Sequence, residues 1–185
     1  VLVLNVSGPV ALDMWEKRFD GIFCCFLPGM QGANALADCL VGTVNPSGTL
    51  PLSWPKRLED MPTYLNFPGD GMQVQYGEGI FVGYRWYDAR KIAPLYSFGY
   101  GLSYTEFSIE SVVAVQERFT EEVTVNVTVK NTGARAGKTV VQLYVSDMES
   151  TLTKPVKELK AFRKVHLEPR ESKIVSFTLG RHAFE

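Results

Sequence analysis

Residues 21–42 read GIFCCFLPGMQGANALADCLVG, and they contain the clearest fold signal in the chain. The apolar run at 21–27 is typical of a buried strand, and the turn pair Pro28-Gly29 ends it. A helical pattern follows, with apolar residues spaced three and four apart: Ala33, Leu36, Ala37, Leu40 and Val41. Gly42 predicts the end of that helix. Strand, turn and helix in this order form half of a βαβ unit, which predicts a parallel sheet with helices packed on it.

An apolar run also opens the chain: residues 1–6 read VLVLNV, and Ser7-Gly8-Pro9 close the run. Such a run predicts a strand buried on both faces of a parallel sheet. No Met, signal sequence or polar segment precedes it, so we expect residue 1 to lie inside a domain. Further along, residues 49–55 (TLPLSWP) are extended but interrupted by prolines. We expect them at a sheet edge or outside the sheet.

Residues 56–101 are rich in Gly, Pro, Tyr, Phe and Trp and show no clean period. This composition predicts a long ordered loop that wraps a surface. Loops of this length and aromatic content usually bind ligands or hold domains together.

The pattern changes after Tyr104. Residues 121–130 alternate apolar and polar side chains, and residues 139–145 and 173–179 read as further strands. Short strands with one face toward water predict an antiparallel β-sandwich, but we count about five from residue 106 onward, against about seven in an immunoglobulin-like domain. The sequence therefore predicts two modules: part of an α/β lobe with the long aromatic loop at 1–105, and a truncated β-sandwich at 106–185.

Charge and composition exclude several classes of protein. The 185 residues carry 19 Lys and Arg against 20 Asp and Glu, a net charge of −1, which argues against nucleic-acid binding. No apolar run approaches the roughly 18 residues of a membrane span. The three cysteines, two of them adjacent at Cys24 and Cys25, predict neither a disulfide nor a metal site. This cysteine usage indicates either a reducing compartment, which slightly favours a cytoplasmic over a secreted setting, or merely a fold that does not depend on disulfides.

The best-placed candidate carboxylates are Glu78, which lies between two glycines, and Asp88. A pair of carboxyl groups is the chemistry of glycoside hydrolysis. Four aromatic residues nearby have faces suited to stacking on sugars: Tyr76, Tyr84, Trp86 and Tyr87. The alternative, which we favour, is that Glu78 and Asp88 are ion-pair or turn partners of Arg85 and Arg90.

Other chemistries fit less well. Both histidines, His166 and His182, lie in the predicted sandwich, and Ser47 lacks the G-x-S-x-G elbow, so a serine hydrolase is rejected. The turn before the helix lacks both G-x-G-x-x-G and the Walker lysine. A polar ligand against Gln31 stays open there, because ligands gather at the carboxyl ends of parallel strands.

Several segments together resemble the C-terminal half of family 3 glycoside hydrolases. They are GPV at 8–10 with Trp15, PGMQGANALADCLVGTVNPSGTLPLSWP at 28–55, YGEGIFVGYRWYD at 76–88 and YSFGYGLSYTEF at 96–107. Two more are similar to the fibronectin-III-like domain that follows in many of those enzymes. These are VKNTGARAGKTVVQLYV at 129–145 and KPVKELKAFRKVHLEP at 154–169.

The resemblance implies a retaining β-glycosidase with a catalytic (β/α)8 barrel, an α/β sandwich lobe and a fibronectin-III-like domain. It places the nucleophilic aspartate in the barrel and the acid/base glutamate upstream of residue 1, so we expect no catalytic residue, metal or cofactor in this chain. It also implies that Gln31, Glu78, Arg85 and Asp88 border the substrate pocket. As an alternative, Arg85 and Asp88 tie the loop to the lobe.

The string VGYRWYD at 82–88 resembles the glucosidase branch of the family more than the xylosidase branch. The expected partners are therefore a β-glucoside or oligosaccharide and a barrel on the same or a companion chain, with no nucleic acid or membrane. A homo-oligomer, a β-xylosidase, a barrel downstream of this segment and a stand-alone carbohydrate-binding or interaction module stay open as alternatives.

Overall fold

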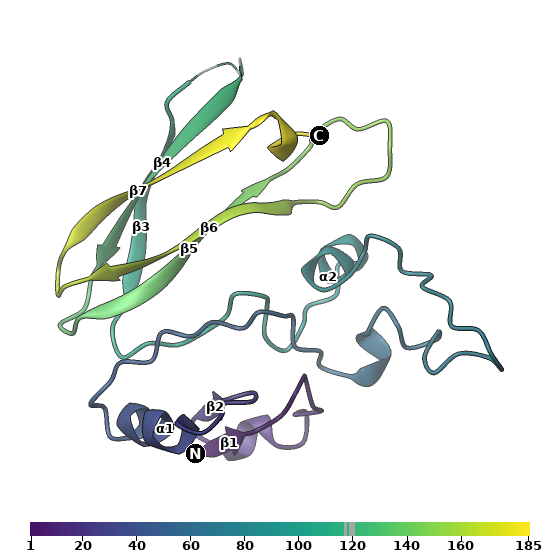
Figure 1. Cartoon of the computed structure of the whole chain (residues 1–185), viewed down its shortest axis with the longest axis horizontal. Coiled ribbons are helices and arrows are strands. Elements are labelled where there is room, and N and C mark those ends of the chain that lie inside the picture. Colours follow the sequence, from purple (N-terminus) through teal and green to yellow (C-terminus); the bar gives the residue numbers. More distant parts are fainter. Residues whose placement is uncertain (117, 119–120) are drawn as a thin grey trace. The chain divides into compact units, whose positions relative to one another are not determined.

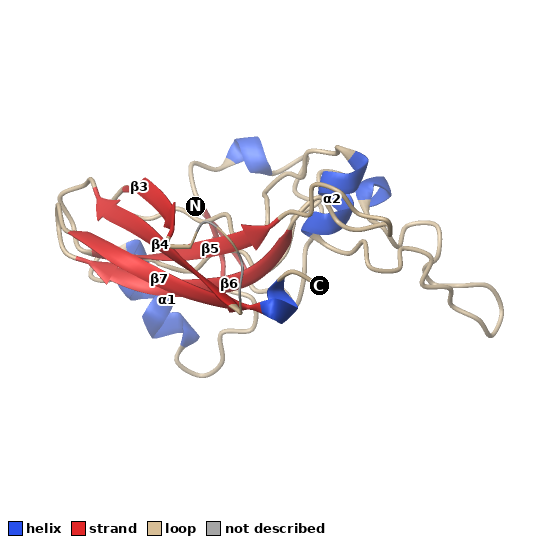
Figure 2. Ribbon diagram, turned by 90° about the horizontal axis from the view of Figure 1, so that it is seen from above, coloured by secondary structure: helices blue, strands red, loops and turns tan. Residues whose placement is uncertain are grey.

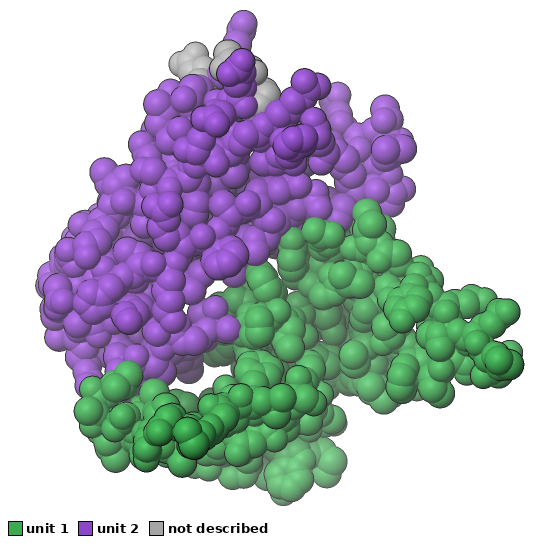
Figure 3. All heavy atoms as spheres, viewed as in Figure 1, with its two compact units in different colours: residues 1–44, 50–100 green, residues 45–49, 101–185 purple. Residues whose placement is uncertain are grey.

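A computed structural model describes residues 1–116, 118 and 121–185 of the chain, traced in Figure 1. These residues form two compact units, coloured separately in Figure 3. The first unit comprises residues 1–44 and 50–100, and the second comprises residues 45–49 and 101–185. No helix in the described part of the chain is long and apolar enough to cross a membrane.

The first unit contains the predicted parallel sheet. Strand β1 (Leu2–Leu4) pairs in parallel with β2 (Ile22–Cys24), and the short helix η1 (Glu16–Arg18) lies in the connection between them. Helix α1 (Gly32–Leu40) follows β2. The expectation that the first strand is buried on both faces is wrong for this chain, because Val3 lies on an exposed face while the neighbouring leucines are half-buried. Two strands and one helix do not cover both sides of a sheet.

Helix α1 begins and ends close to the predicted residues. Gly32 is buried at its start, where a Cβ atom would meet the Pro28 ring at 2.5 Å, so only glycine allows this close approach. At the other end Gly42 has φ +81° and donates its backbone N–H to the carbonyl of Cys39 at 3.1 Å. A left-handed glycine of this kind is a common helix stop.

The proline-interrupted segment after residue 49 leaves the β1–β2 sheet and runs antiparallel to residues 95–100. Leu50 accepts from the N–H of Gly99 and donates to the carbonyl of Tyr100, both at 2.8 Å. Further along, Trp54 bridges to Tyr96 and is only 1% exposed. The indole of Trp54 also donates to the carbonyl of Val10 at 2.8 Å, which joins this segment to the chain between β1 and β2.

The predicted loop at 56–101 contains two helical elements that the sequence reading missed: η2 (Leu58–Asp60) and α2 (Tyr84–Arg90). Helix α2 starts after Gly83, at φ +56°, and stops at Lys91, whose backbone is left-handed. Seven residues make barely two turns, so the helix is too short for a hydrophobic period to stand out.

The second unit is an antiparallel β-sandwich, seen from another side in Figure 2. One sheet has the order β3–β4–β7, and β5 pairs with β6 to form the other. The strands are β3 (Phe107–Ala114), β4 (Glu122–Asn131), β5 (Gly137–Val145), β6 (Glu158–Leu167) and β7 (Ser172–Gly180). A short helix, η3 (Arg181–Ala183), follows β7. The five strands of the described residues agree with the count predicted from the sequence.

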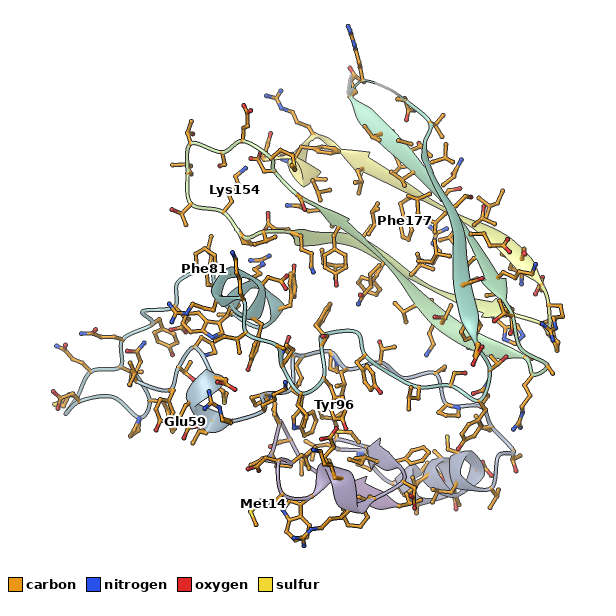
Figure 4. The ribbon with its side chains drawn as sticks, turned by 180° about the vertical axis from the view of Figure 1, so that it is seen from behind. Met14, Glu59, Phe81, Tyr96, Lys154 and Phe177 are labelled. Atoms are coloured by element: carbon orange, nitrogen blue, oxygen red, sulfur yellow. The ribbon has the colours of Figure 1, made fainter. Side chains whose placement is uncertain are left out.

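The core of the sandwich lies between its two sheets. Alternate residues of β4 point into it, as the period-two pattern predicts. The buried residues are Val127, Val129, Val141, Leu167, Val175 and Phe177. Phe177 of β7 points between the sheets in Figure 4.

A five-residue segment from the middle of the chain, residues 45–49, packs with the sandwich. The Asn45 side chain donates to the carbonyl of Ala136 at 2.9 Å and accepts from the Ser103 hydroxyl at 2.9 Å and the Tyr104 N–H at 2.8 Å. The sequence reading groups these five residues with 1–105, whereas in the structure they pack with the second unit.

Candidate functional site

Glu78 lies in a tight turn that leaves one of its carboxylate oxygens without a donor. The turn is closed by the Gly79 N–H, which donates to the Tyr76 carbonyl at 3.2 Å, and by the Phe81 N–H, which donates to the Glu78 carbonyl at 3.0 Å. The side chain is half-buried, and its Oε2 atom is buried with no hydrogen-bond donor among the described residues. This oxygen is therefore enclosed by the chain itself and is closed to a ligand in the folded turn.

Arg85 and Asp88 both lie on α2, three residues apart, so they share one face of the helix. Both are half-buried. Arg90, the other predicted partner, places its guanidinium 5.4 Å from the centre of the Trp86 ring in a cation–π contact. The structure thus brings Arg85 and Asp88 together on one short helix, a few residues after Glu78.

Gln31 lies elsewhere in the first unit. It is exposed at the start of α1, and its side chain accepts from the Asn34 amide at 2.8 Å. Helices α1 and α2 lie well apart in Figure 1. The four predicted pocket residues therefore form two separate groups within the described unit, Gln31 on one side and the other three on the α2 side.

Three of the four aromatic residues proposed as sugar platforms take part in internal packing instead. Tyr87 is 4% exposed, and Tyr84 packs against Phe98 with ring centres 5.3 Å apart. The Trp86 indole donates to the Asp60 carbonyl at 2.9 Å and lies under Arg90. Only Tyr76, at 80% exposure, presents an open ring.

Asp60 is a buried carboxylate that the sequence reading missed. Arg57 donates to it through Nη2 at 2.7 Å and Nε at 3.5 Å, and this arginine holds the pKa of the Asp60 carboxyl below its ordinary value. Burial, and then the negative charge of Asp60, raises the pKa of the Tyr87 hydroxyl. The i, i+3 spacing in RLED at 57–60 was the available signal. The ion pair closes η2 on itself, and the Trp86 bond couples η2 to α2.

The second unit has a small open hollow whose lining includes Asp147, Lys154, Glu158, Lys160 and Glu185. Lys154 pairs with Asp147 at 3.1 Å and Lys160 with Glu158 at 3.2 Å. Both lysines of the hollow are therefore already paired with carboxylates of the same unit.

The histidines lie on the sandwich, as predicted. His166 is 3.0 Å from Glu168 and His182 is 2.9 Å from Glu185, and both histidines are exposed. Within the described ranges, no group of three or more His, Cys, Asp or Glu residues is placed to hold a metal ion.

The described residues form an α/β lobe portion and a fibronectin-like β-sandwich, and sequence comparison identifies the family to which they belong. The Glycosyl hydrolase family 3 C-terminal domain matches residues 1–104, and the fibronectin type III-like domain matches residues 139–185. The chain therefore belongs to glycosyl hydrolase family 3, as the resemblance in its motifs predicted, and its fold class is confirmed.

Similar proteins are much longer than this chain. The thermostable beta-glucosidase B of Acetivibrio thermocellus is 46% identical over 100% of this chain and 24% of its own length. Beta-glucosidase BoGH3A of Bacteroides ovatus is also 46% identical, over 100% of this chain and 26% of its own length. The chain spans about a quarter of the relatives that it matches.

Solved structures show the same fold. Beta-glucosidase 3B from Thermotoga neapolitana in complex with glucose superposes with a TM-score of 0.90 and 39% identity, over 96% of this chain and 25% of that one. The GH3 beta-glucosidase of Bifidobacterium adolescentis gives a TM-score of 0.93 and 40% identity, over 98% and 27%.

Proposed function

We propose that this chain is the non-barrel portion of a retaining β-glucosidase that hydrolyses terminal non-reducing β-glucosyl residues of glucosides or oligosaccharides. The observation that carries the proposal is the 46% identity to two beta-glucosidases over the whole chain. The proposal includes the division into an α/β lobe portion at 1–105 and a truncated fibronectin-III-like domain at 106–185.

In a retaining glycosidase one carboxylate attacks the anomeric carbon while a second carboxylic acid protonates the leaving oxygen. We assign neither role to this chain: the nucleophile belongs to a (β/α)8 barrel and the acid/base to the lobe before residue 1. The chain acts on the substrate through the pocket rim. Glu78, Arg85 and Asp88 supply polar groups from one side and Gln31 from the other, and no metal or cofactor is required.

The substrate assignment rests on the VGYRWYD string at 82–88 and on the names of the relatives. Both favour a glucoside over a xyloside. A β-glucoside carries a hydroxymethyl group that a β-xyloside lacks, so a pocket that binds this group through hydrogen bonds discriminates between the two sugars.

The direct test is to express the intact gene product and compare p-nitrophenyl β-glucoside with the matching β-xyloside. We expect a higher kcat/KM for the glucoside, and no hydrolysis by residues 1–185 alone. A xyloside preference would replace the substrate assignment. Activity on neither sugar would contradict the glycosidase proposal and favour a non-catalytic binding module.

A further inference from the structure

Trp15 is an aromatic residue that the proposed function leaves without a role. It is 50% exposed, and the neighbouring Met14 is 68% exposed and points outward in Figure 4. Trp54 is 1% exposed and Trp86 is half-buried, so Trp15 is the most exposed tryptophan of the chain. An indole this open is unusual, because tryptophan is a large residue that is highly buried on average.

The turn that carries Trp15 is fixed by three hydrogen bonds. The backbone N–H groups of Trp15 and Glu16 both donate to the carbonyl of Leu12 at 2.8 Å, and Leu12 itself is buried. The Glu16 carboxylate accepts from the Tyr96 hydroxyl at 3.4 Å, which ties the turn to a distant segment of the same unit. The exposed indole therefore stands on a preformed turn.

This turn lies in the connection that follows the carboxyl end of β1. Strand β1 ends at Leu4, and residues 5–15 lead from it into η1. The strand pairs in parallel with β2. In open α/β sheets, ligands bind beyond the carboxyl ends of parallel strands, and the connections there form the ligand sites. Trp15 is thus part of a connection of this kind.

Arg18 supplies polar groups beside the Trp15 ring. Its guanidinium carbon lies 5.9 Å from the centre of the ring, in a cation–π contact. Within the described residues the guanidinium forms no ion pair and no hydrogen bond, so its N–H donors are available. The indole and the guanidinium together present a flat apolar surface with hydrogen-bond donors next to it.

We propose that Trp15 and Arg18 bind the leaving-side sugar of an oligosaccharide substrate, the indole by stacking and the guanidinium by hydrogen bonds to hydroxyl groups. This assignment rests on the proposed function. A pyranose ring has an apolar C–H face and a rim of hydroxyl oxygens, and the flat ring with its adjacent donors complements both. The two reacting carboxylates flank the bond that breaks and are assigned to other parts of the enzyme. The sugar that this chain receives is therefore the one released with the leaving oxygen.

A comparison of two substrates tests the assignment in the intact enzyme. A β-linked glucose disaccharide has a leaving sugar, whereas methyl β-glucoside has none. Trp15→Ala should raise KM for the disaccharide about tenfold and change kcat/KM for methyl β-glucoside by less than about twofold. Trp15→Phe should restore part of the disaccharide affinity, because it keeps a flat ring.

Phe162→Ala is the matched control, because it removes an exposed ring from β6 of the second unit. It should change neither kinetic value. Equal losses on both substrates for Trp15→Ala, or no loss on the disaccharide, would overturn the assignment.

Oxidation of the unsubstituted enzyme gives a second test that does not depend on how a variant folds. Hydroxyl radicals oxidise exposed side chains, and peptide mass spectrometry compares Trp15 with Met148, which is 90% exposed on the second unit. We expect a sulfur-linked β-glucose disaccharide, which resists hydrolysis, to slow the oxidation of Trp15 several-fold relative to Met148. Methyl thio-β-glucoside, which lacks the leaving sugar, should give no such protection. Equal protection by the two compounds would contradict the stacking.

The same readout separates the other occupants of this surface. If Trp15 oxidises slowly in the intact enzyme without a ligand, another part of the enzyme covers the indole. If it becomes protected as the concentration of residues 1–185 alone rises, a second copy covers it. Either result overturns the assignment. Protection by the disaccharide in an intact protein that hydrolyses no β-glucoside would leave the sugar site standing and reject the proposed function.

Discussion

Asp60 shows how a single buried charge connects two elements of the first unit. Its side chain is 7% exposed, but its partner Arg57 is 68% exposed, so the ion pair lies at the protein surface. The Asp60 backbone carbonyl meanwhile accepts from the Trp86 indole. One residue thus anchors η2 through its side chain and α2 through its main chain.

This arrangement predicts a pH-dependent stability. The Arg57 hydrogen bond lowers the folded-state pKa of Asp60 below its ordinary value of 3.8. The stabilisation is therefore complete above that value and is lost as the pH falls through the lowered folded-state pKa. Asp60→Asn should lower the thermal midpoint by a few degrees near neutral pH, a modest effect because water screens the exposed arginine. The difference from wild type should shrink in acid.

Thermal unfolding followed by circular dichroism across the acidic range checks this prediction. Glu59→Gln is the control, since the neighbouring carboxylate is exposed. A difference between wild type and Asp60→Asn that stays constant down to the lowest pH would show that the ion pair is not its cause.

At the scale of elements, the start of β5 illustrates how close backbone approach assembles the sandwich. Gly137 is buried there, and a Cβ atom on it would lie 2.8 Å from the Thr105 methyl and 2.9 Å from the Asn45 amide. Asn131, fully buried at the end of β4, accepts from the Thr105 hydroxyl at 2.7 Å. The strand ends are therefore joined by side chains from outside the sheets.

Gly137→Ala should destabilise the second unit by about 1–3 kcal/mol, because the methyl group overfills a packed junction. Gly180→Ala is the matched control: it lies at the end of β7, and nothing is within 4 Å of its Cβ position. We expect the control to change the free energy of unfolding by less than about 0.5 kcal/mol. Urea unfolding of both variants measures the difference, and equal values would show that the junction adapts to the methyl group.

At the scale of the whole chain, exposed apolar side chains are found on both units. In the first unit they include Met30 at 94% and Leu27 at 77%, and in the second Ile174 at 68% and Phe162 at 70%. Surfaces of this kind promote association when no partner covers them.

We therefore expect residues 1–185, expressed alone, to self-associate or to require a companion chain for solubility. Sedimentation velocity at increasing concentration measures this directly, and the weight-average sedimentation coefficient should rise. A monomer at every concentration that also unfolds in one cooperative transition would contradict the expectation.

Short-range patterns correctly predicted much of the fold. Backbone geometry gives a helix a period of 3.6 residues and a strand a period of 2, so both patterns can be seen within a short stretch of sequence. This is why the sequence predicted the strand, turn and helix of residues 21–42 and the alternating strand of residues 121–130. Helix α2 was missed for the same reason, since its seven residues are too few to show a period and its ends depend on Gly83 and Lys91. Family membership also followed from the residues, because several motifs occur together in the order of family 3.

The placement of side chains was decided only by tertiary structure. Their closeness in the sequence suggested that Tyr84, Trp86 and Tyr87 are open to a ligand. In the folded unit Tyr84 packs against Phe98, and Trp86 contacts Arg90 and the Asp60 carbonyl. Tyr87 is buried near the Asp60 charge. Likewise, only the folded chain brings Asn45 to Ala136, ninety-one residues away. Such contacts depend on which distant segments meet in the folded chain, and a local sequence pattern carries no information about that.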